Sequence, residues 1–285
     1  MKRSLAIAVV AVLAACGKPS RQLDRARDLA LKGHARAALM AVKGALFALS
    51  EDASPQAQDD RLRALKLAGD LLALDLEQPA EAALYYRRVA VEYAGTEDAW
   101  AARLRLAELY KDKLKDPVTA ATEYLGLVAA YPSHPGVDDV QLRAARAFLD
   151  AGNYRQAEAE ARALPTRFPS SPLAPGAQVV VGHALHLDGR PADAALALRE
   201  VATRWPSSPE APLALAEAGD CLASAGNFRL AVQSYIEALA AHPDPRSVQD
   251  QLARVRRRMA QAKPVGYDHA AVFDHRMAAR HNVGE

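Results

Sequence analysis

Cysteine and aromatic residues are scarce in this chain, and neither sign of charge is in marked excess. Its 285 residues include two cysteines, Cys16 and Cys221, and 6% aromatic residues. The formal net charge is +2 at pH 7, which is well below the basic excess that strong non-specific nucleic-acid binding requires. No segment shows a strand pattern, whereas the abundant alanine favours closely packed helices. We therefore predict an all-α protein that does not bind nucleic acid.

The sequence also lacks an apolar run long enough to span a bilayer permanently. The run from Leu5 to Ala15 is too short, but it follows Lys2 and Arg3 as in a secretory signal. It ends in Leu13-Ala14-Ala15-Cys16, which resembles the lipobox of bacterial lipoproteins. That resemblance implies cleavage before Cys16 and lipidation of its sulfur and new amino terminus. The alternative is an ordinary secreted protein with a chance cysteine.

The segment after Cys16 bears on the location of the anchor. Residues 1–15 are the predicted signal peptide, and residues 16–22 form a short lipidated tether. Gly17 stands where an aspartate favours inner-membrane retention in many enteric bacteria, so we expect the periplasmic face of the outer membrane. With Cys16 lipidated, Cys221 has no internal partner. We expect Cys221 to be a buried, inert thiol, the alternative being a reactive or intermolecular cysteine.

A period of 37 residues organises the rest of the chain. Four prolines recur at this interval, each directly after an aromatic residue or histidine: Tyr131-Pro132, Phe168-Pro169, Trp205-Pro206 and His242-Pro243. An alanine lies eleven residues before each of these aromatic or histidine residues: Ala120, Ala157, Ala194 and Ala231. A fixed period of this length indicates stacked copies of one small structural unit.

Each copy reads as two helices joined by a tight turn. In the best copy, Gly152-Asn153-Tyr154 supplies the turn, and small or apolar residues follow at helical spacing: Ala157, Ala161, Leu164 and Phe168. A small residue recurs in the preceding helix of several copies: Gly69, Ala107, Ala145, Gly182 and Gly219. This pattern resembles the tetratricopeptide repeat over about residues 23–262. The resemblance implies a right-handed all-α solenoid of about six helix-turn-helix repeats.

The other copies and the flanks are less regular. The turn at 115–117 is one residue longer than the others, and the polar stretch from Ser50 to Asp60 is expected to be a long loop. Residues 246–262 form the predicted closing helix, which uses Val248, Leu252, Val255 and Met259 to cap the array and belongs to the 23–262 domain. Its arginines form a solvated face or contact acidic lipid or a partner. Residues 263–285 are expected to form a flexible tail or one short helix.

No residue pattern indicates catalysis or a cofactor. His183 and His186, three apart on one predicted helix, lack a third metal ligand nearby. His269, His275 and His281 recur every six residues, a spacing that does not align them on one helical face. We therefore predict no enzyme activity, no metal and no cofactor.

By resemblance to the tetratricopeptide repeat, the first helices of the pairs line a binding groove. The implied groove residues are Lys66, Asp70, Leu104, Glu108, Leu142, Arg146, His183 and Asp220. Their mixed charge favours a peptide or protein surface as ligand, and the alternative is that they are solvated helix faces.

Pro132 begins a Pro-Ser-His-Pro junction, and Pro169 and Pro206 each begin a Pro-Ser-Ser-Pro junction. Such junctions are similar to those of lipoproteins of the BamD type and Tol-associated envelope coordinators. We expect a non-catalytic scaffold that binds other envelope proteins, attaches to the membrane through Cys16, and has no small-molecule substrate. Outer-membrane protein assembly is the favoured role. A pilotin-like role at a secretin or motility machine, a regulatory scaffold or enzyme of peptidoglycan remodelling, and a small-ligand carrier remain alternatives.

Overall fold

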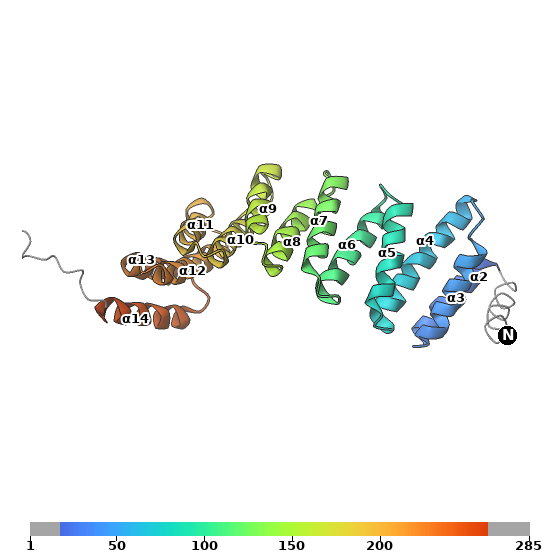
Figure 1. Cartoon of the computed structure of the whole chain (residues 1–285), viewed down its shortest axis with the longest axis horizontal. Coiled ribbons are helices and arrows are strands. Elements are labelled where there is room, and N and C mark those ends of the chain that lie inside the picture. The colour runs from blue at the N-terminus through green and yellow to red at the C-terminus, as the bar shows by residue number, and fades with distance from the viewer. Residues whose placement is uncertain (1–17, 262–285) are drawn as a thin grey trace, which may run out of the picture. The chain divides into compact units, whose positions relative to one another are not determined.

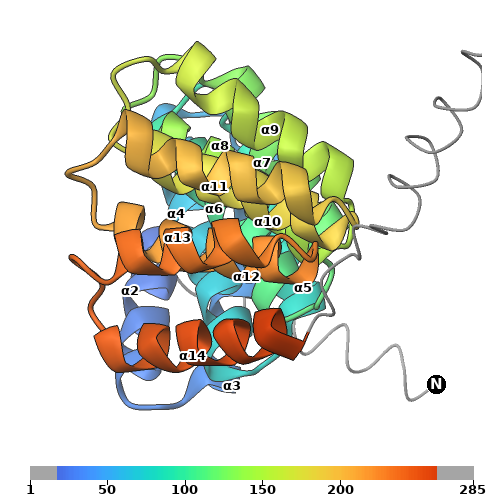
Figure 2. The same ribbon diagram turned by 90° about the vertical axis from the view of Figure 1, so that its left-hand side faces the viewer.

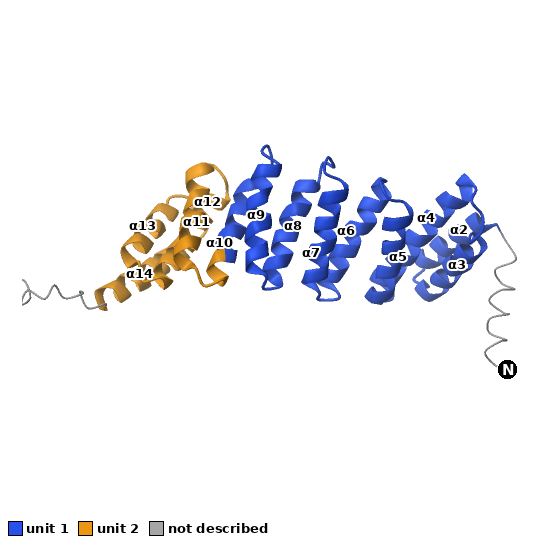
Figure 3. Cartoon of the chain, turned by 45° about the horizontal axis from the view of Figure 1, so that its top comes forward, with its two compact units in different colours: residues 1–184 blue, residues 185–285 orange. Residues whose placement is uncertain are grey.

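The computed structural model describes residues 18–261, and it divides into two compact units with a boundary after Ala184 (Figure 3). The predicted signal peptide, residues 16 and 17 of the predicted tether and the whole predicted tail therefore lie outside the described residues. The rest of the predicted tether is a correction, because a helix already begins at Pro19. Within residues 18–261 the secondary structure is helical, with no strand. The predicted all-α fold is confirmed.

Thirteen α-helices and one π-helical segment, η1, follow one another along the described chain (Figure 1). In the first unit they are α2 (Pro19–Leu31), α3 (Ala35–Ala48), α4 (Pro55–Asp70), η1 (Leu71–Asp75), α5 (Pro79–Glu92), α6 (Glu97–Asp112), α7 (Pro117–Ala130), α8 (Val137–Asp150) and α9 (Tyr154–Arg167). Helix α10 (Ala174–Leu187) contains the unit boundary. The second unit continues with α11 (Pro191–Arg204), α12 (Glu210–Ser224), α13 (Phe228–Ala238) and α14 (Pro245–Gln261). The sequence order gives six successive pairs, α2–α3 to α12–α13, and a closing helix.

The tight turns follow from local backbone chemistry. Between α8 and α9 the amide of Asn153 donates to the carbonyl of Phe148 at 2.9 Å, and Gly152 adopts φ +75°. A left-handed residue at this point lets the last carbonyls of a helix find donors, and glycine adopts that conformation without steric cost. Lys115 has φ +55° before α7, where the turn is one residue longer, as predicted.

The aromatic residues at the ends of the second helices connect neighbouring pairs. The hydroxyl of Tyr93 donates to the carbonyl of Gln58 at 2.8 Å, 35 residues earlier. The amide of Gly95 donates to the hydroxyl of Tyr131 at 3.1 Å, 36 residues later. The ring of Tyr131 also packs edge-on against Trp100, with 5.5 Å between ring centroids. A side chain that recurs with the repeat period thus makes contacts that recur with it.

Alanine fills the helix crossings of the core. Ala120, Ala157, Ala194 and Ala231 are all fully buried. Helix α14 lies beside α13 (Figure 2) and buries Val248, Leu252 and Val255, as predicted for a closing helix. Met259 is a correction, because its side chain is 45% exposed. It lies near the end of α14, past the residues that this helix buries.

The predicted long loop at 50–60 is also wrong, because α4 begins at Pro55. Proline is favoured at the first helical position, and the Ser54 hydroxyl caps the helix by accepting a hydrogen bond from the Ala57 amide at 3.2 Å. The polar residues that suggested a loop form the first turns of a helix whose Ala57 and Asp60 are buried.

Candidate protein-interaction surfaces

An acidic residue follows the small residue of the first helix in three pairs, and each acid is engaged within the chain. In the second pair, Asp70 of α4 accepts a hydrogen bond at 2.8 Å from the hydroxyl of Tyr86 on α5. The same carboxylate forms an ion pair with Arg105 on α6. Asp70 therefore links α5, the second helix of its own pair, to α6, the first helix of the next pair.

Glu108 and Asp220 occupy the corresponding place in later pairs. Glu108 accepts a hydrogen bond at 2.8 Å from Arg143 on α8, 35 residues later. Asp220 accepts one at 2.6 Å from the hydroxyl of Tyr235 on α13 and one at 3.1 Å from Gln251 on α14. Burial, and secondarily the hydrogen bond to Asp220, raises the pKa of Tyr235, so this hydroxyl stays protonated and continues to donate. These contacts give the acids a structural role.

The other predicted groove residues do not gather into one site. Lys66 forms an ion pair with Asp98 on α6, and Leu104 is half-buried against the core. Leu142 is a correction, since it is only 2% exposed and does not line an open surface. His183 is half-buried. Arg146 is exposed and makes no ion pair with any other residue of 18–261, so it remains available to a partner.

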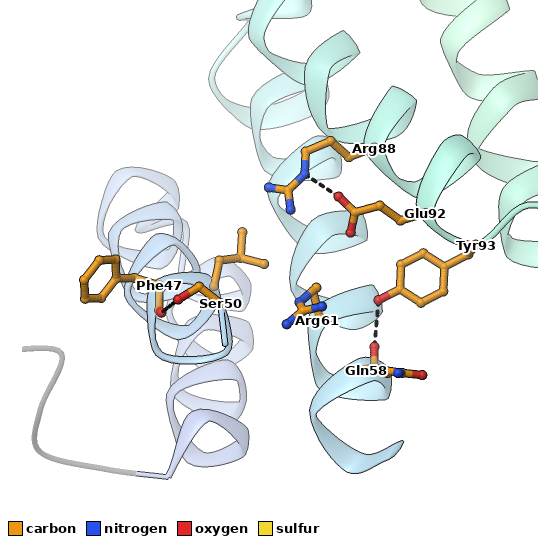
Figure 4. Close-up of a pocket in the computed structure, with 8 residues that line it drawn as sticks. Phe47, Ser50, Gln58, Arg61, Arg88, Glu92 and Tyr93 are labelled. Carbon is orange, nitrogen blue, oxygen red and sulfur yellow. Dashed lines mark hydrogen bonds and ion pairs between the residues drawn. The ribbon is translucent and has the colours of Figure 1, made fainter. Parts of the chain in front are cut away.

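A cleft of about 690 Å³ lies instead beside α3, α4 and α5 (Figure 4). Its lining residues are Leu46, Phe47, Ser50, Gln58, Arg61, Arg88, Glu92 and Tyr93. Arg88 donates to Glu92 at 2.8 Å, and Arg61 donates at 3.2 Å to the carbonyl of Asp52. Burial raises the pKa of Tyr93, so its hydroxyl remains a donor at neutral pH. The cleft combines an apolar side with fixed charges of both signs.

A second cleft, of about 340 Å³, shares Leu46 and Arg88 with the first and adds Lys43, Leu84 and Tyr85. Leu84 is 57% exposed, although it lies on the second helix of its pair. We call the two together the α3–α5 cleft. Apolar side chains open to solvent, edged by cations and a carboxylate, suit an amphipathic peptide or a protein segment.

A similar cleft, which we call the α7–α9 cleft, lies two pairs later between the second helices α7 and α9. This cleft has a volume of about 500 Å³ and is lined by Leu125, Val128, Ala129, Pro132, Glu160, Arg167 and Phe168. Sequence reasoning missed both clefts because it followed the buried residues of the repeat. The available signal was a set of large apolar residues on second helices, such as Phe47 and Leu84, that the repeat pattern does not require.

Cys221 is the remaining chemical candidate, and its predicted burial is confirmed. Its Sγ lies 3.5 Å from Nδ1 of His186. Burial, followed by the nearby charges of Asp220 and Glu217, raises the pKa of this thiol to about 11, which keeps it protonated and unreactive at neutral pH. Residues 18–261 contain no cluster of three or more potential metal ligands. None of their helices is both long and apolar enough to cross a membrane.

Comparisons with known proteins agree with this architecture. A family model described as "Tetratricopeptide repeat" matches residues 142–209. RapI in its apo form is 12% identical with a TM-score of 0.54, and the match covers 85% of this chain and 72% of that chain. PilW, described as a widely conserved type IV pilus biogenesis factor, is 15% identical with a TM-score of 0.47, covering 82% and 98% of the two chains.

A tetratricopeptide repeat protein from Parabacteroides merdae is 14% identical with a TM-score of 0.43, covering 84% of this chain and 99% of that one. No curated protein matches the chain. The family-model match supports tetratricopeptide repeats in this chain, and the likeness to RapI supports the all-α fold. Proteins with such repeats generally act as non-catalytic scaffolds that bind other proteins.

Proposed function

We propose that this chain of tetratricopeptide repeats is a non-catalytic scaffold of the bacterial envelope, held by lipid on Cys16 at the periplasmic face of the outer membrane. The observation that carries the location is the sequence Leu13-Ala14-Ala15-Cys16 after a basic start and a short apolar run. Two or more acyl chains on one residue hold a protein at a bilayer for long times, whereas one chain holds it marginally.

The scaffold acts by binding partner proteins beside the membrane. The α3–α5 cleft and the α7–α9 cleft present open apolar side chains together with charged groups. Anchoring confines the protein and its envelope partners to one surface, which raises their effective concentration without any new contact. Outer-membrane protein assembly is the role that we favour.

The anchor is tested by replacing Cys16 with serine. A serine hydroxyl does not accept the diacylglyceryl group that a lipobox cysteine receives, so we expect the variant to move from the membrane fraction to the soluble fraction. Fractionation at high salt and immunoblotting measure the shift, and Cys221→Ser serves as the matched control that stays in the membrane. Membrane residence of Cys16→Ser at high salt would contradict the lipid anchor.

Partners are identified by in-cell crosslinking from the α3–α5 cleft. A photo-crosslinking amino acid replaces Leu84, which is 57% exposed, and the matched control carries it at Leu196, which is 69% exposed and lines none of these clefts. We expect barrel-assembly proteins to crosslink from position 84 alone. A secretin or motility protein would instead assign a pilotin-like role, and equal products from both positions would reject the cleft as the binding surface.

A further inference from the structure

The first helical pair has a charge unlike the rest of the protein. Residues 18–48 contain seven lysines and arginines but two aspartates, a net charge of +5, whereas the whole chain has a net charge of +2. The seven cations are Lys18, Arg21, Arg25, Arg27, Lys32, Arg36 and Lys43, and all are exposed. Within residues 18–261, only Lys43 of these seven has an ion-pair partner, Glu81 at 3.9 Å. The first pair therefore presents unneutralised positive charge.

Large apolar side chains are interleaved with these cations. On α3, Arg36, Met40, Lys43 and Phe47 follow spacings of four, three and four residues, which place them on one helical face. Met40 is 58% exposed and Phe47 is 70% exposed. The ring of Phe47 points away from Arg61 and Tyr93 at the rim of the cleft (Figure 4). Leu31, the last residue of α2, is 87% exposed.

We propose that α2 and α3 form a second membrane contact, in which their cations bind the phosphates of anionic phospholipids while Leu31 and Met40 enter the headgroup region and Phe47 stays at the rim of the α3–α5 cleft. Basic helices with exposed apolar residues bind such surfaces both by electrostatic attraction to anionic lipid and by burial of apolar area. Anionic lipid supplies the charge that complements the net +5 of residues 18–48. This proposal rests in part on the proposed anchor, which brings the pair to the bilayer.

The short stretch of chain between Cys16 and α2 supports anionic lipid as the ligand of this surface. Two residues, Gly17 and Lys18, separate Cys16 from Pro19, where α2 begins, and the three extended residue steps span at most about 10 Å. The electrostatic attraction of a charged bilayer is screened over about 8 Å at physiological salt. With Cys16 in the membrane, the cations at the start of α2 lie within or close to that range. The contact restricts the rotation of the first unit on its tether.

Vesicle binding by a lipid-free protein tests this surface separately from the anchor. The chain from Gly17 to Glu285 keeps every described residue. It is sedimented with vesicles of phosphatidylcholine alone or with about 30 mol% phosphatidylglycerol, a lipid that carries the negative surface charge. We expect binding to the anionic vesicles to be at least about tenfold stronger, and to weaken as salt is raised. Equal affinity for the two vesicles would overturn the proposal.

Charge reversal locates the contact. The variant Arg21→Glu, Arg25→Glu, Arg36→Glu places two glutamates in the first turns of α2 and α3, where the helix dipole favours negative charge, and one at the middle of α2. We expect it to lose about tenfold or more in affinity for anionic vesicles while its circular dichroism is unchanged. The matched variant Lys111→Glu, Lys113→Glu, Arg146→Glu changes the net charge equally and should lose less than about twofold.

The apolar part of the contact has its own variant, Leu31→Gln with Met40→Gln, which we expect to reduce the binding that survives high salt. Equal losses in the two charge-reversal variants would reduce the effect to overall charge and overturn the proposal. Binding of anionic vesicles together with a soluble Cys16→Ser variant would be compatible with both proposals. If Cys16→Ser stays in the membrane at high salt while vesicle binding follows α2 and α3, the anchor fails and this surface stands.

Discussion

Replacing Tyr235 with alanine is expected to lower the free energy of unfolding of the second unit by about 3–5 kcal/mol, in the range of other deletions of large buried aromatic rings. Its side chain is 1% exposed and packs between α12 and α13. The hydroxyl donates to Asp220 at 2.6 Å. Alanine leaves a cavity at the crossing and removes one of the two donors to this carboxylate, the other being Gln251.

One further variant separates the contribution of the ring from that of the hydroxyl, and a second serves as an exposed control on the same helix. Tyr235→Phe keeps the ring and removes one hydrogen bond to a carboxylate, so we expect a loss of about 1.5–3 kcal/mol. Leu230→Ala removes a side chain that is 50% exposed on the same helix and should cost about 1 kcal/mol or less. Chemical denaturation followed by circular dichroism measures all three. A loss for Tyr235→Ala no larger than that for Tyr235→Phe would contradict the packing role of the ring.

Gly69→Ala is expected to lower the free energy of unfolding by about 1–3 kcal/mol, because it overpacks the crossing of α4 and α5. A Cβ added to Gly69 would lie 2.7 Å from Cε1 of Tyr86, closer than side chains pack. The ring must move away, and its hydroxyl then loses the bond to Asp70. The third pair supports this reason, since it has Ala107 at this position and no hydrogen bond between Tyr124 and Glu108.

The matched control is Gly44→Ala on α3. Gly44 is also within a helix, but the nearest atom to its added Cβ is Oε1 of Gln22 at 3.6 Å, an ordinary contact. Alanine inside a helix is favoured over glycine, so we expect this variant to gain about 0.5–1 kcal/mol. Thermal melting of both variants gives the comparison, and a stabilised Gly69→Ala would show that the Tyr86 ring is not held as described.

Much of the fold could be predicted because the same types of residue recur at the same positions in successive copies of the repeat. The interval between Pro132, Pro169, Pro206 and Pro243 predicted the pairs, and Gly152-Asn153 predicted the turn that follows α8. The buried alanines were predicted for the same reason, since only small side chains let two helices cross closely. Periodic features of this kind depend on residues near one another in the chain.

The candidate sites were less predictable because they depend on neighbouring pairs. The resemblance to the tetratricopeptide repeat placed Asp70, Glu108 and Asp220 on a groove for partners. In the structure these acids bind Arg105, Arg143 and Gln251, residues 35, 35 and 31 positions later. The spacing brings such residues together only once successive helices are stacked. A residue's position in the repeat therefore does not show whether a neighbour already occupies it.

The sequence by itself determined the helical repeat, the tight turns, the alanine crossings and the closing helix, because these follow from helical periodicity and from the backbone preferences of glycine and proline. It also determined the uneven charge of residues 18–48, which composition alone shows. Only the tertiary structure decided which polar groups remain available and where the clefts lie. Availability depends on side chains from different pairs, whose desolvation and hydrogen bonding are set by packing between helices that are distant in sequence.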